Sequence, residues 1–258
     1  MASNIPIHKL GFGVESCIFY PPFPCQEAYL NTQYVNDNYV QKFSRRPERE
    51  LKWIPILSAI DPLQKYFVYP LPDKCTPRVS ITELKKSCDK IRTDESFIYF
   101  MPHVVGNTLQ EEFNRPYIDP YNIIFWFIKL LTAIQLLQKH HLMHGDLHPQ
   151  NILIDASLNP KVIDYGTLKR FDYPTKMDIM QDLFHLSASF TDSITMREVT
   201  FQNQNSPLIN EFINIMKTII DTYFKREEDQ VITVDDVLQE MYELLFRYKD
   251  KQPAENKS

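Results

Sequence analysis

Two short polar stretches lie between apolar runs near the middle of the chain. The first is His144-Gly-Asp-Leu-His-Pro-Gln-Asn151 and the second is Asp164-Tyr-Gly166. They bring together two carboxylates, two amides and two imidazoles. Phosphoryl transfer needs an oriented acceptor hydroxyl and divalent cations that neutralise phosphate charge, and hard cations prefer oxygen ligands. The residue types in these stretches therefore suit phosphoryl transfer.

The spacing of these residues resembles the catalytic and metal-binding motifs of the protein-kinase superfamily. His144-x-Asp146 is similar to the histidine and aspartate of H-R-D, Asn151 to the loop asparagine, and Asp164-Tyr-Gly166 to D-F-G. The resemblance implies that Asp146 orients the acceptor hydroxyl and takes its proton. It implies that Asn151 and Asp164 hold Mg²⁺ or Mn²⁺. It also makes His148 a catalytic-loop residue, where serine/threonine kinases usually carry lysine.

A glycine-containing turn near the N-terminus resembles the kinase loop that covers the phosphates of ATP. The segment Leu10-Gly-Phe-Gly-Val-Glu-Ser16 places Gly11, Gly13 and Ser16 in a G-x-G-x-x-G-like pattern, with serine at the third glycine position. A G-x-G pair alone is common in loops. Its order and its distance from the catalytic motifs strengthen the resemblance.

The segment Tyr39-Val-Gln-Lys42 is similar to the kinase V-A-I-K strand. Lys42 is therefore expected to bind the α- and β-phosphates while a helix carboxylate orients it. We expect Glu50 to be this partner because Ile54, four residues later, supplies an apolar contact one helical turn on. Glu48 is the alternative partner.

The same resemblance implies a lining for the adenine ring and a hinge at residues 100–103, whose backbone reads the adenine edge. Gly106 to Leu109 resembles the G-x-x-L that follows this hinge. The expected lining residues are Ile18, Val40, Met101, His103, Leu153 and Ile163.

The chain departs from the kinase pattern at several positions. Gly145 replaces the usual arginine, and the segment between Gly166 and the buried aspartate expected at Asp182 is short and has no A-P-E. The His-Gly-Asp-Leu-His-Pro stretch also resembles aminoglycoside and choline kinases. Two alternatives therefore stay open beside a serine/threonine protein kinase: a small-molecule kinase, and a nucleotide-binding pseudokinase.

Two segments favour a protein substrate. The stretches 59–70 and 20–25 are similar to divergent kinase-like proteins of large DNA viruses, which are generally interpreted as serine/threonine protein kinases. Two hypotheses without a kinase were also weighed. Asp146 and Asp164 could be ordinary turn residues, or four nearby histidines could bind zinc, although Gly145 and Pro149 disfavour the helix that such ligation needs. These histidines are His140, His141, His144 and His148.

Local patterns predict an antiparallel sheet in the first hundred residues and helices in the rest, and the kinase resemblance implies that these are the two lobes of an α+β, protein-kinase-like fold, with one main helix in the smaller lobe. A small antiparallel lobe over residues 1–103 precedes a helical lobe over 104–249, and 250–258 is expected to be a disordered tail. Apolar alternation and helical spacing place strands at 16–20, 39–43, 66–69 and 97–101, and helices at 47–57, 81–91 and about 120–139, with further helices opening at 206 and 233.

Composition argues against nucleic-acid binding, secretion and a membrane span. The net charge of −5 and the scattered basic residues give no footprint for nucleic acid. Four cysteines without a C-x-x-C pair, and an N-terminus without a charged and apolar leader, favour a reducing, intracellular setting. The apolar run 123–137 is interrupted by polar residues, so it predicts a buried helix and not a membrane span. The oligomeric state is not predicted.

Overall fold

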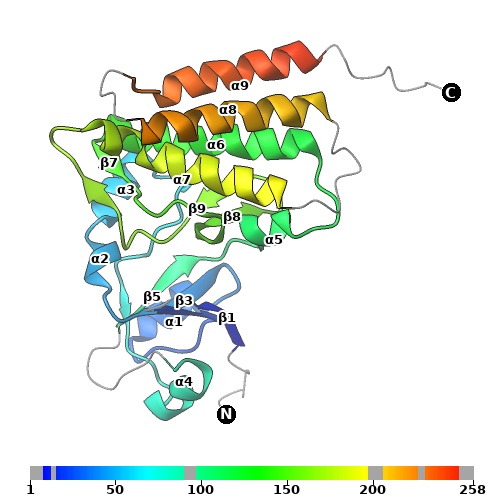
Figure 1. Ribbon diagram of the computed structural model, residues 1–258. Helices are drawn as coiled ribbons and strands as arrows, with labels where there is room; N and C mark the ends of the chain where they lie inside the picture. The colour runs from blue at the N-terminus through cyan, green and yellow to red at the C-terminus, as the bar shows by residue number, and fades with distance from the viewer. Residues whose placement is uncertain (1–7, 13–15, 90–96, 197–205, 226–229, 250–258) are drawn as a thin grey trace. The chain divides into compact units, whose positions relative to one another are not determined.

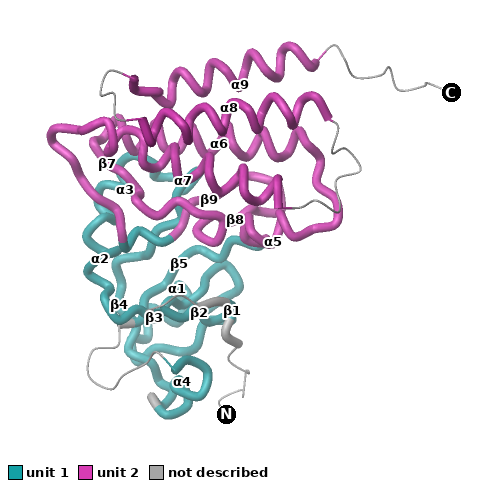
Figure 2. Tube along the Cα trace, in the orientation of Figure 1, with its two compact units in different colours: residues 1–105, 164–166 teal, residues 106–163, 167–258 magenta. Residues whose placement is uncertain are grey.

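The computed structural model describes residues 8–12, 16–89, 97–196, 206–225 and 230–249 (Figure 1). The chain forms two compact units (Figure 2). Unit 1 comprises residues 1–105 together with 164–166, and unit 2 comprises 106–163 and 167–258. The expected boundary at 103/104 lies close to the observed one, but 164–166 were expected in the second lobe and belong to unit 1. The expected tail, 250–258, lies outside the described residues.

Unit 1 is built on a five-stranded antiparallel sheet in the order β1-β2-β3-β5-β4. The strands predicted at 16–20, 39–43 and 97–101 are present, the latter two each with one further residue. The strands are β1 (His8–Phe12), β2 (Ser16–Tyr20), β3 (Tyr39–Ser44), β4 (Lys74–Cys75) and β5 (Phe97–Pro102).

Because successive side chains of a strand point to opposite faces, this sheet has two different faces. One, which we call the cystine face, packs into a buried apolar core that includes Cys17, Phe19, Phe43, Ile98 and Phe100. On the opposite face, Lys42 lies directly across from Ile18 of β2 and Tyr99 of β5. We call this the lysine face.

The helix predicted over 47–57 is divided in two. The structure has α2 (Glu48–Leu51) and α3 (Ile54–Ile60), separated by a turn at Lys52 and Trp53. Pro55 explains the break, because it has no N–H to donate to the carbonyl of Leu51.

The other helices of unit 1 are α1 and α4. No local pattern predicted α1 (Ala28–Tyr34). The helix predicted over 81–91 is observed as α4 (Ile81–Ser87), closed at its start by a capping box between Ser80 and Glu83.

The strand predicted at 66–69 is wrong. Tyr66 lies in a bend and Phe67 makes a single bridge, so the segment forms no strand of the sheet. The buried Asp61 carboxylate accepts the backbone N–H groups of Lys65, Tyr66 and Phe67 at 2.9, 2.7 and 2.9 Å. Donors that a strand would use for a ladder are therefore bound to one side chain.

Unit 2 is mainly helical, and α6, α7, α8 and α9 lie side by side (Figure 1). A three-stranded sheet, β6-β8-β9, and a two-stranded pair, β7-β10, complete it. The helices are α5 (Leu109–Phe113), α6 (Pro120–Lys139), α7 (Lys176–Thr195), α8 (Pro207–Phe224) and α9 (Val234–Lys249). The strands are β6 (Gly106–Thr108), β7 (Leu142–Met143), β8 (Ile152–Asp155), β9 (Pro160–Val162) and β10 (Lys169–Arg170).

Helix α6 begins and ends where the sequence predicts. Asp119 caps it by accepting the backbone N–H of Tyr121 at 2.9 Å, and Pro120 occupies the first turn. By length and composition α6 could cross a membrane. Of its most apolar 18-residue stretch, 61% is buried inside the protein. This burial agrees with the prediction of a core helix.

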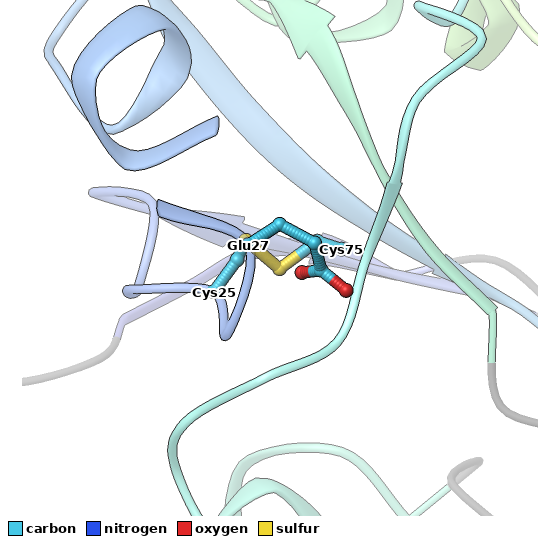
Figure 3. A group of neighbouring side chains, drawn as sticks. All are labelled: Cys25, Glu27 and Cys75. Carbon is cyan, nitrogen blue, oxygen red and sulfur yellow. A yellow bond between two sulfur atoms is a disulfide. The ribbon is translucent and has the colours of Figure 1, made fainter. Parts of the chain in front are cut away.

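All four cysteines form disulfides, which the sequence did not predict. Cys17 pairs with Cys88 and Cys25 with Cys75 (Figure 3), and all four side chains are buried in unit 1. The partners lie 71 and 50 residues apart in sequence. No local spacing could have indicated such pairs.

Candidate active site

A buried ion pair lies on the lysine face of unit 1. The Nζ of Lys42 in β3 donates to both carboxylate oxygens of Glu50 in α2, at 2.6 and 2.7 Å. Both side chains are at most 6% exposed, whereas Glu48 is exposed. Of the two candidate partners, Glu50 therefore makes the contact with Lys42.

Opposing effects act on the ammonium of Lys42. Burial alone would lower the pKa of Lys42, but the charges of Glu50 and Asp164 and the hydrogen bonds to Glu50 raise it above the ordinary value. Lys42 is therefore a cation throughout the neutral range. Replacing such a buried pair with apolar groups is often neutral or stabilising, so the fold alone gives little reason for it.

Asp164 belongs to unit 1 and has a left-handed backbone conformation, with φ of 64°. Its Oδ1 accepts the backbone N–H of Gly166 at 3.3 Å, a local bond of the kind that makes this conformation tolerable for aspartate. The next residue, Tyr165, is fully buried. Burial and then the charges of Glu50 and Asp61 raise the pKa of its hydroxyl well above the ordinary value.

Tyr99 is a site neighbour that sequence analysis missed. It is fully buried and lies across from Lys42. Its hydroxyl has no partner with good hydrogen-bond distance and angle among the described residues, although Glu50 and Ser44 lie close enough to shift its pKa. Burial and the nearby Glu50 nevertheless raise the pKa of Tyr99 well above the ordinary value, so the hydroxyl stays protonated. Only the strand register could have placed it here.

The isosteric change Tyr99→Phe is expected to leave the free energy of unfolding unchanged or to raise it by up to about 1 kcal/mol. It removes a buried hydroxyl that has no partner and keeps the ring. The control is Tyr69→Phe, which removes a hydroxyl that donates to the Asp61 carbonyl at 3.2 Å and should cost about 1 kcal/mol. Urea unfolding of both variants is the measurement. A greater loss for Tyr99→Phe than for Tyr69→Phe would contradict this assignment.

Other predicted nucleotide-binding residues lie in the same sheet. Ile18 is half-buried, and Val40 lies across from Met101 in the β3–β5 ladder. The backbone of Gly11 in β1 pairs with Ile18. Ser16 begins β2 and is half-buried. Gly13, the other predicted glycine, lies outside the described residues.

His103, at the end of the predicted hinge, is bound to the loop that precedes β3. Its backbone N–H donates to the carbonyl of Asn38 at 2.8 Å, one step beyond the β3–β5 ladder. Its Nδ1 lies 3.1 Å from the carbonyl of Asp37, and its ring packs against Tyr20 with centroids 4.3 Å apart. The backbone N–H of His103 is therefore bound within unit 1, and contact of residues 100–103 with adenine stays a prediction.

In unit 2, Asp146, His148 and Asn151 lie on one loop that ends in a short 3₁₀ turn, η1 (Pro149–Asn151). The amide nitrogen of Asn151 donates to the Asp146 carbonyl at 3.0 Å and to Asp146 Oδ2 at 3.3 Å. The Oδ1 oxygen of this buried amide is thus the atom left to coordinate a cation. The Asp146 side chain is half exposed, which suits a group that must reach a substrate.

The ring of His148 is oriented by the backbone. Its Nδ1 accepts the N–H of Gln150 at 3.2 Å, so the proton of the neutral ring is on Nε2. That nitrogen lies 3.6 Å from Asp146 Oδ2. His148 can therefore contribute positive charge beside Asp146 when it is protonated.

A buried carboxylate of α7 holds the start of this loop. Asp182 accepts the backbone N–H groups of His144 and Gly145 at 2.7 and 2.8 Å. The fully buried ring of His144 lies 3.2 Å, through Nε2, from the Ile163 carbonyl. Gly145 has φ of 79°, and a Cβ there would lie 3.0 Å from the Thr167 carbonyl. This backbone explains why glycine, and not arginine, suits the position.

Leu153 and Ile163 complete the predicted residues of unit 2. Leu153 pairs with Thr108 and Lys161 in the three-stranded sheet and is half-buried. The backbone N–H of Ile163 donates to the Asn151 carbonyl at 2.9 Å. The loop that carries Asn151 is thus fixed to the residue that precedes Asp164 in the chain.

Gly106 shows why the G-x-x-L resemblance begins with glycine. It pairs with Asp155 in the same sheet. A Cβ at this position would lie 1.9 Å from the Ile154 carbonyl oxygen, which no side chain tolerates.

The zinc hypothesis is not supported. His140 and His141 are exposed, while His144 is buried and bound to Ile163. Within the described part of the chain, the only group of three or more potential metal ligands is Cys25, Glu27 and Cys75.

Comparison with known proteins decides the fold. The protein kinase domain family matches residues 74–187. The chain has a protein-kinase-like fold. The match covers fewer than half of the residues, and it includes Asp146, Asn151 and Asp164.

Several relatives of this kinase-like chain are protein kinases by name. A probable serine/threonine-protein kinase KIN1 homolog of Enterocytozoon bieneusi is 31% identical over 88 residues, which are 34% of this chain and 15% of that protein. A cGMP-dependent protein kinase of Eimeria tenella is 30% identical over 79 residues, 30% of the chain and 8% of the relative.

A sucrose non-fermenting protein kinase 1 of Fusarium virguliforme is 26% identical over 121 residues, 47% of the chain and 14% of the relative. The chain thus matches less than a fifth of the length of each of these three relatives. The matches support a place in the protein-kinase-like superfamily, and the viral affinity remains a prediction.

Proposed function

We propose that the chain transfers the γ-phosphoryl group of ATP to serine or threonine hydroxyls of proteins. The observation that carries the proposal is the buried Lys42–Glu50 pair. A lysine desolvated to this degree is costly, and a phosphate anion gives it a function that the fold does not need. The relatives that are named as serine/threonine kinases favour a protein acceptor.

The residues present fit ATP with a divalent cation. Lys42 is a permanent cation for the α- and β-phosphates, and Glu50 fixes its direction. Asp164 and the Oδ1 of Asn151 offer the oxygen ligands that Mg²⁺ or Mn²⁺ prefers. When bound, the cation neutralises charge that develops on the phosphates during transfer.

Asp146 is the proposed proton acceptor. Its carboxylate would accept the proton of the substrate hydroxyl, and the amide of Asn151 holds it in place. Asp182 positions the loop through the backbone of His144 and Gly145. His148 would stabilise negative charge beside Asp146.

Transfer of labelled γ-phosphate is the test. Wild type and Asp164→Ala are offered mixed protein substrates and, separately, a panel of small alcohols, each with Mg²⁺ or Mn²⁺. Label on serine or threonine with wild type only is the expected result. Label confined to a small alcohol would favour the small-molecule kinase. ATP binding without any transfer would favour the pseudokinase.

A further inference from the structure

Both disulfides lie on the cystine face of unit 1, behind the strand that carries Lys42. Cys17 is in β2, which pairs with β3, and Cys75 is in β4, which pairs with β5. Every cysteine side chain is at most 1% exposed. The sulfurs are therefore part of the buried core that packs against the cystine face, and Lys42 lies on the opposite face of the same sheet.

Gln41 connects the second disulfide to the lysine face. It precedes Lys42 in β3 and is fully buried. Its Nε2 lies 3.5 and 3.4 Å from the sulfurs of Cys25 and Cys75. The same amide donates to the Phe23 carbonyl at 2.9 Å and accepts the Phe23 N–H at 2.8 Å. The residue beside Lys42 is thus held by the disulfide and its neighbouring chain.

The disulfides also hold a segment that has little other attachment to the sheet. Residues 74–88 contribute only the two-residue strand β4. Near Cys25, the backbone of Gln26 donates to Thr76 at 2.7 Å, and Arg78 donates to Pro24 at 2.9 Å. At the other end of the segment, Cys88 follows α4 and bonds to Cys17. Both ends of the segment are therefore covalently linked to the core.

The carboxylate of Glu27 is a neighbour of the Cys25–Cys75 disulfide. It lies within 4.8 Å of the sulfurs of Cys25 and Cys75 (Figure 3). Hydrogen bonds from Thr76, at 2.6 and 2.9 Å, lower the pKa of Glu27, so it is charged at neutral pH. Beside this negative charge, thiols released by reduction would stay protonated. The sulfurs of the oxidised pair are bonded to each other and are not metal ligands.

We propose that these two disulfides make nucleotide binding by unit 1 dependent on its redox state: the oxidised unit binds ATP, and the reduced unit binds it more weakly. This rests on the proposed function. Each bond forms when two thiols lose two protons and two electrons. The electrons pass to a small disulfide such as oxidised glutathione, whose sulfurs take up the protons as two thiols.

If the oxidised form binds ATP, the chain is expected to work in an oxidising compartment, because reducing compartments keep thiols reduced. This differs from the reducing setting expected from the sequence. That expectation relied on the absence of a C-x-x-C pair and on an N-terminus without a charged and apolar leader, and disulfides between distant residues leave no spacing signal.

The experiment compares the full chain in buffers with different ratios of reduced to oxidised glutathione. Alkylation and mass spectrometry count the disulfides, and a fluorescent ATP analogue gives the Kd. We expect two disulfides in oxidising buffer, and a rise in Kd of at least about fivefold when both are reduced. The paired variants Cys25→Ser/Cys75→Ser and Cys17→Ser/Cys88→Ser separate the two bonds. Each should weaken binding in oxidising buffer.

The two tryptophans distinguish a local effect from general unfolding. Trp53 lies in unit 1 and the buried Trp126 in unit 2. In a Trp53→Phe chain, Trp126 alone reports on unit 2, and its emission should not change on reduction. A change would show general unfolding and overturn the proposal. Four thiols in oxidising buffer, or equal Kd in both states, would also overturn it. No ATP binding by the oxidised wild type would instead overturn the proposed function, and the coupling with it.

Discussion

The change Asp146→Asn is expected to lower the rate of phosphoryl transfer by about 10²–10⁴-fold while ATP binding is preserved. An amide has nearly the same shape as a carboxylate but cannot accept the proton of the substrate hydroxyl, and general base catalysis has an effect of this size. The half-exposed side chain contributes little to the fold, so the free energy of unfolding should change by less than about 0.5 kcal/mol. Single-turnover transfer and ATP titration are the measurements.

The matched control is Asp172→Asn. Asp172 is also in unit 2, its side chain is 82% exposed, and its contact is a 3.9 Å approach to Arg170. This variant should transfer phosphate at the wild-type rate. If Asp146→Asn also kept that rate, Asp146 would not be the proton acceptor, and no other residue of the proposed site could replace it.

Local signals in the sequence predicted those parts of the fold that depend on neighbouring residues. Helix α6 was predicted because Asp119 and Pro120 begin it and its own apolar residues define a face. The strands β2 and β3 were predicted from their β-branched and aromatic composition. The capping side chain of Thr233 likewise indicated the start of α9, through its hydrogen bonds with Asp236.

The features that could not be predicted depend on distant contacts. The pairing of Cys17 with Cys88 requires the sheet to form first. Tyr99 lies across from Lys42 only because of the β3–β5 register, which apolar alternation within one strand does not determine. The segment 66–69 has strand composition, but Asp61 binds its donors.

In the candidate site, too, the residues that are close in sequence could be predicted. The motif at 144–151 identified Asp146, His148 and Asn151 because these residues are close in sequence and fold as one loop. Glu50 was preferred over Glu48 because the kinase resemblance implies an apolar residue four positions later, although the single helix that this spacing assumed is divided between Leu51 and Ile54. The break in the helix at Pro55 could also have been anticipated, because a proline at this position removes the hydrogen bond to Leu51.

The change Lys42→Met is expected to lower both phosphoryl transfer and the free energy of unfolding, and a second change should separate these two effects. Removing one partner of a buried ion pair leaves the carboxylate of Glu50 without a counter-charge, which typically costs about 3–5 kcal/mol. Loss of the cation for the phosphates should lower phosphoryl transfer by about 10²–10³-fold. Urea unfolding and labelled phosphate transfer measure the two effects.

The double variant Lys42→Met/Glu50→Leu removes both charges and should recover most of the lost stability, because apolar residues of similar volume often replace a buried pair without cost. Its phosphoryl transfer should remain as low as that of Lys42→Met. The raised pKa of Lys42 keeps the contribution of the pair complete below the ordinary value of 10.5, and it is lost only as the pH rises through the raised value. Measurements at neutral pH therefore report the intact pair.

Lys74→Met is the control for this comparison, because Lys74 lies in β4 of the same sheet and is exposed. It should change the free energy of unfolding by less than about 0.5 kcal/mol and leave transfer unchanged. If the double variant were both stable and active, the ion pair would serve only the fold. Phosphate binding by Lys42 would then be excluded, because a folded site that has lost its cation would still work. A stable but inactive double variant would assign the pair to the phosphates of ATP.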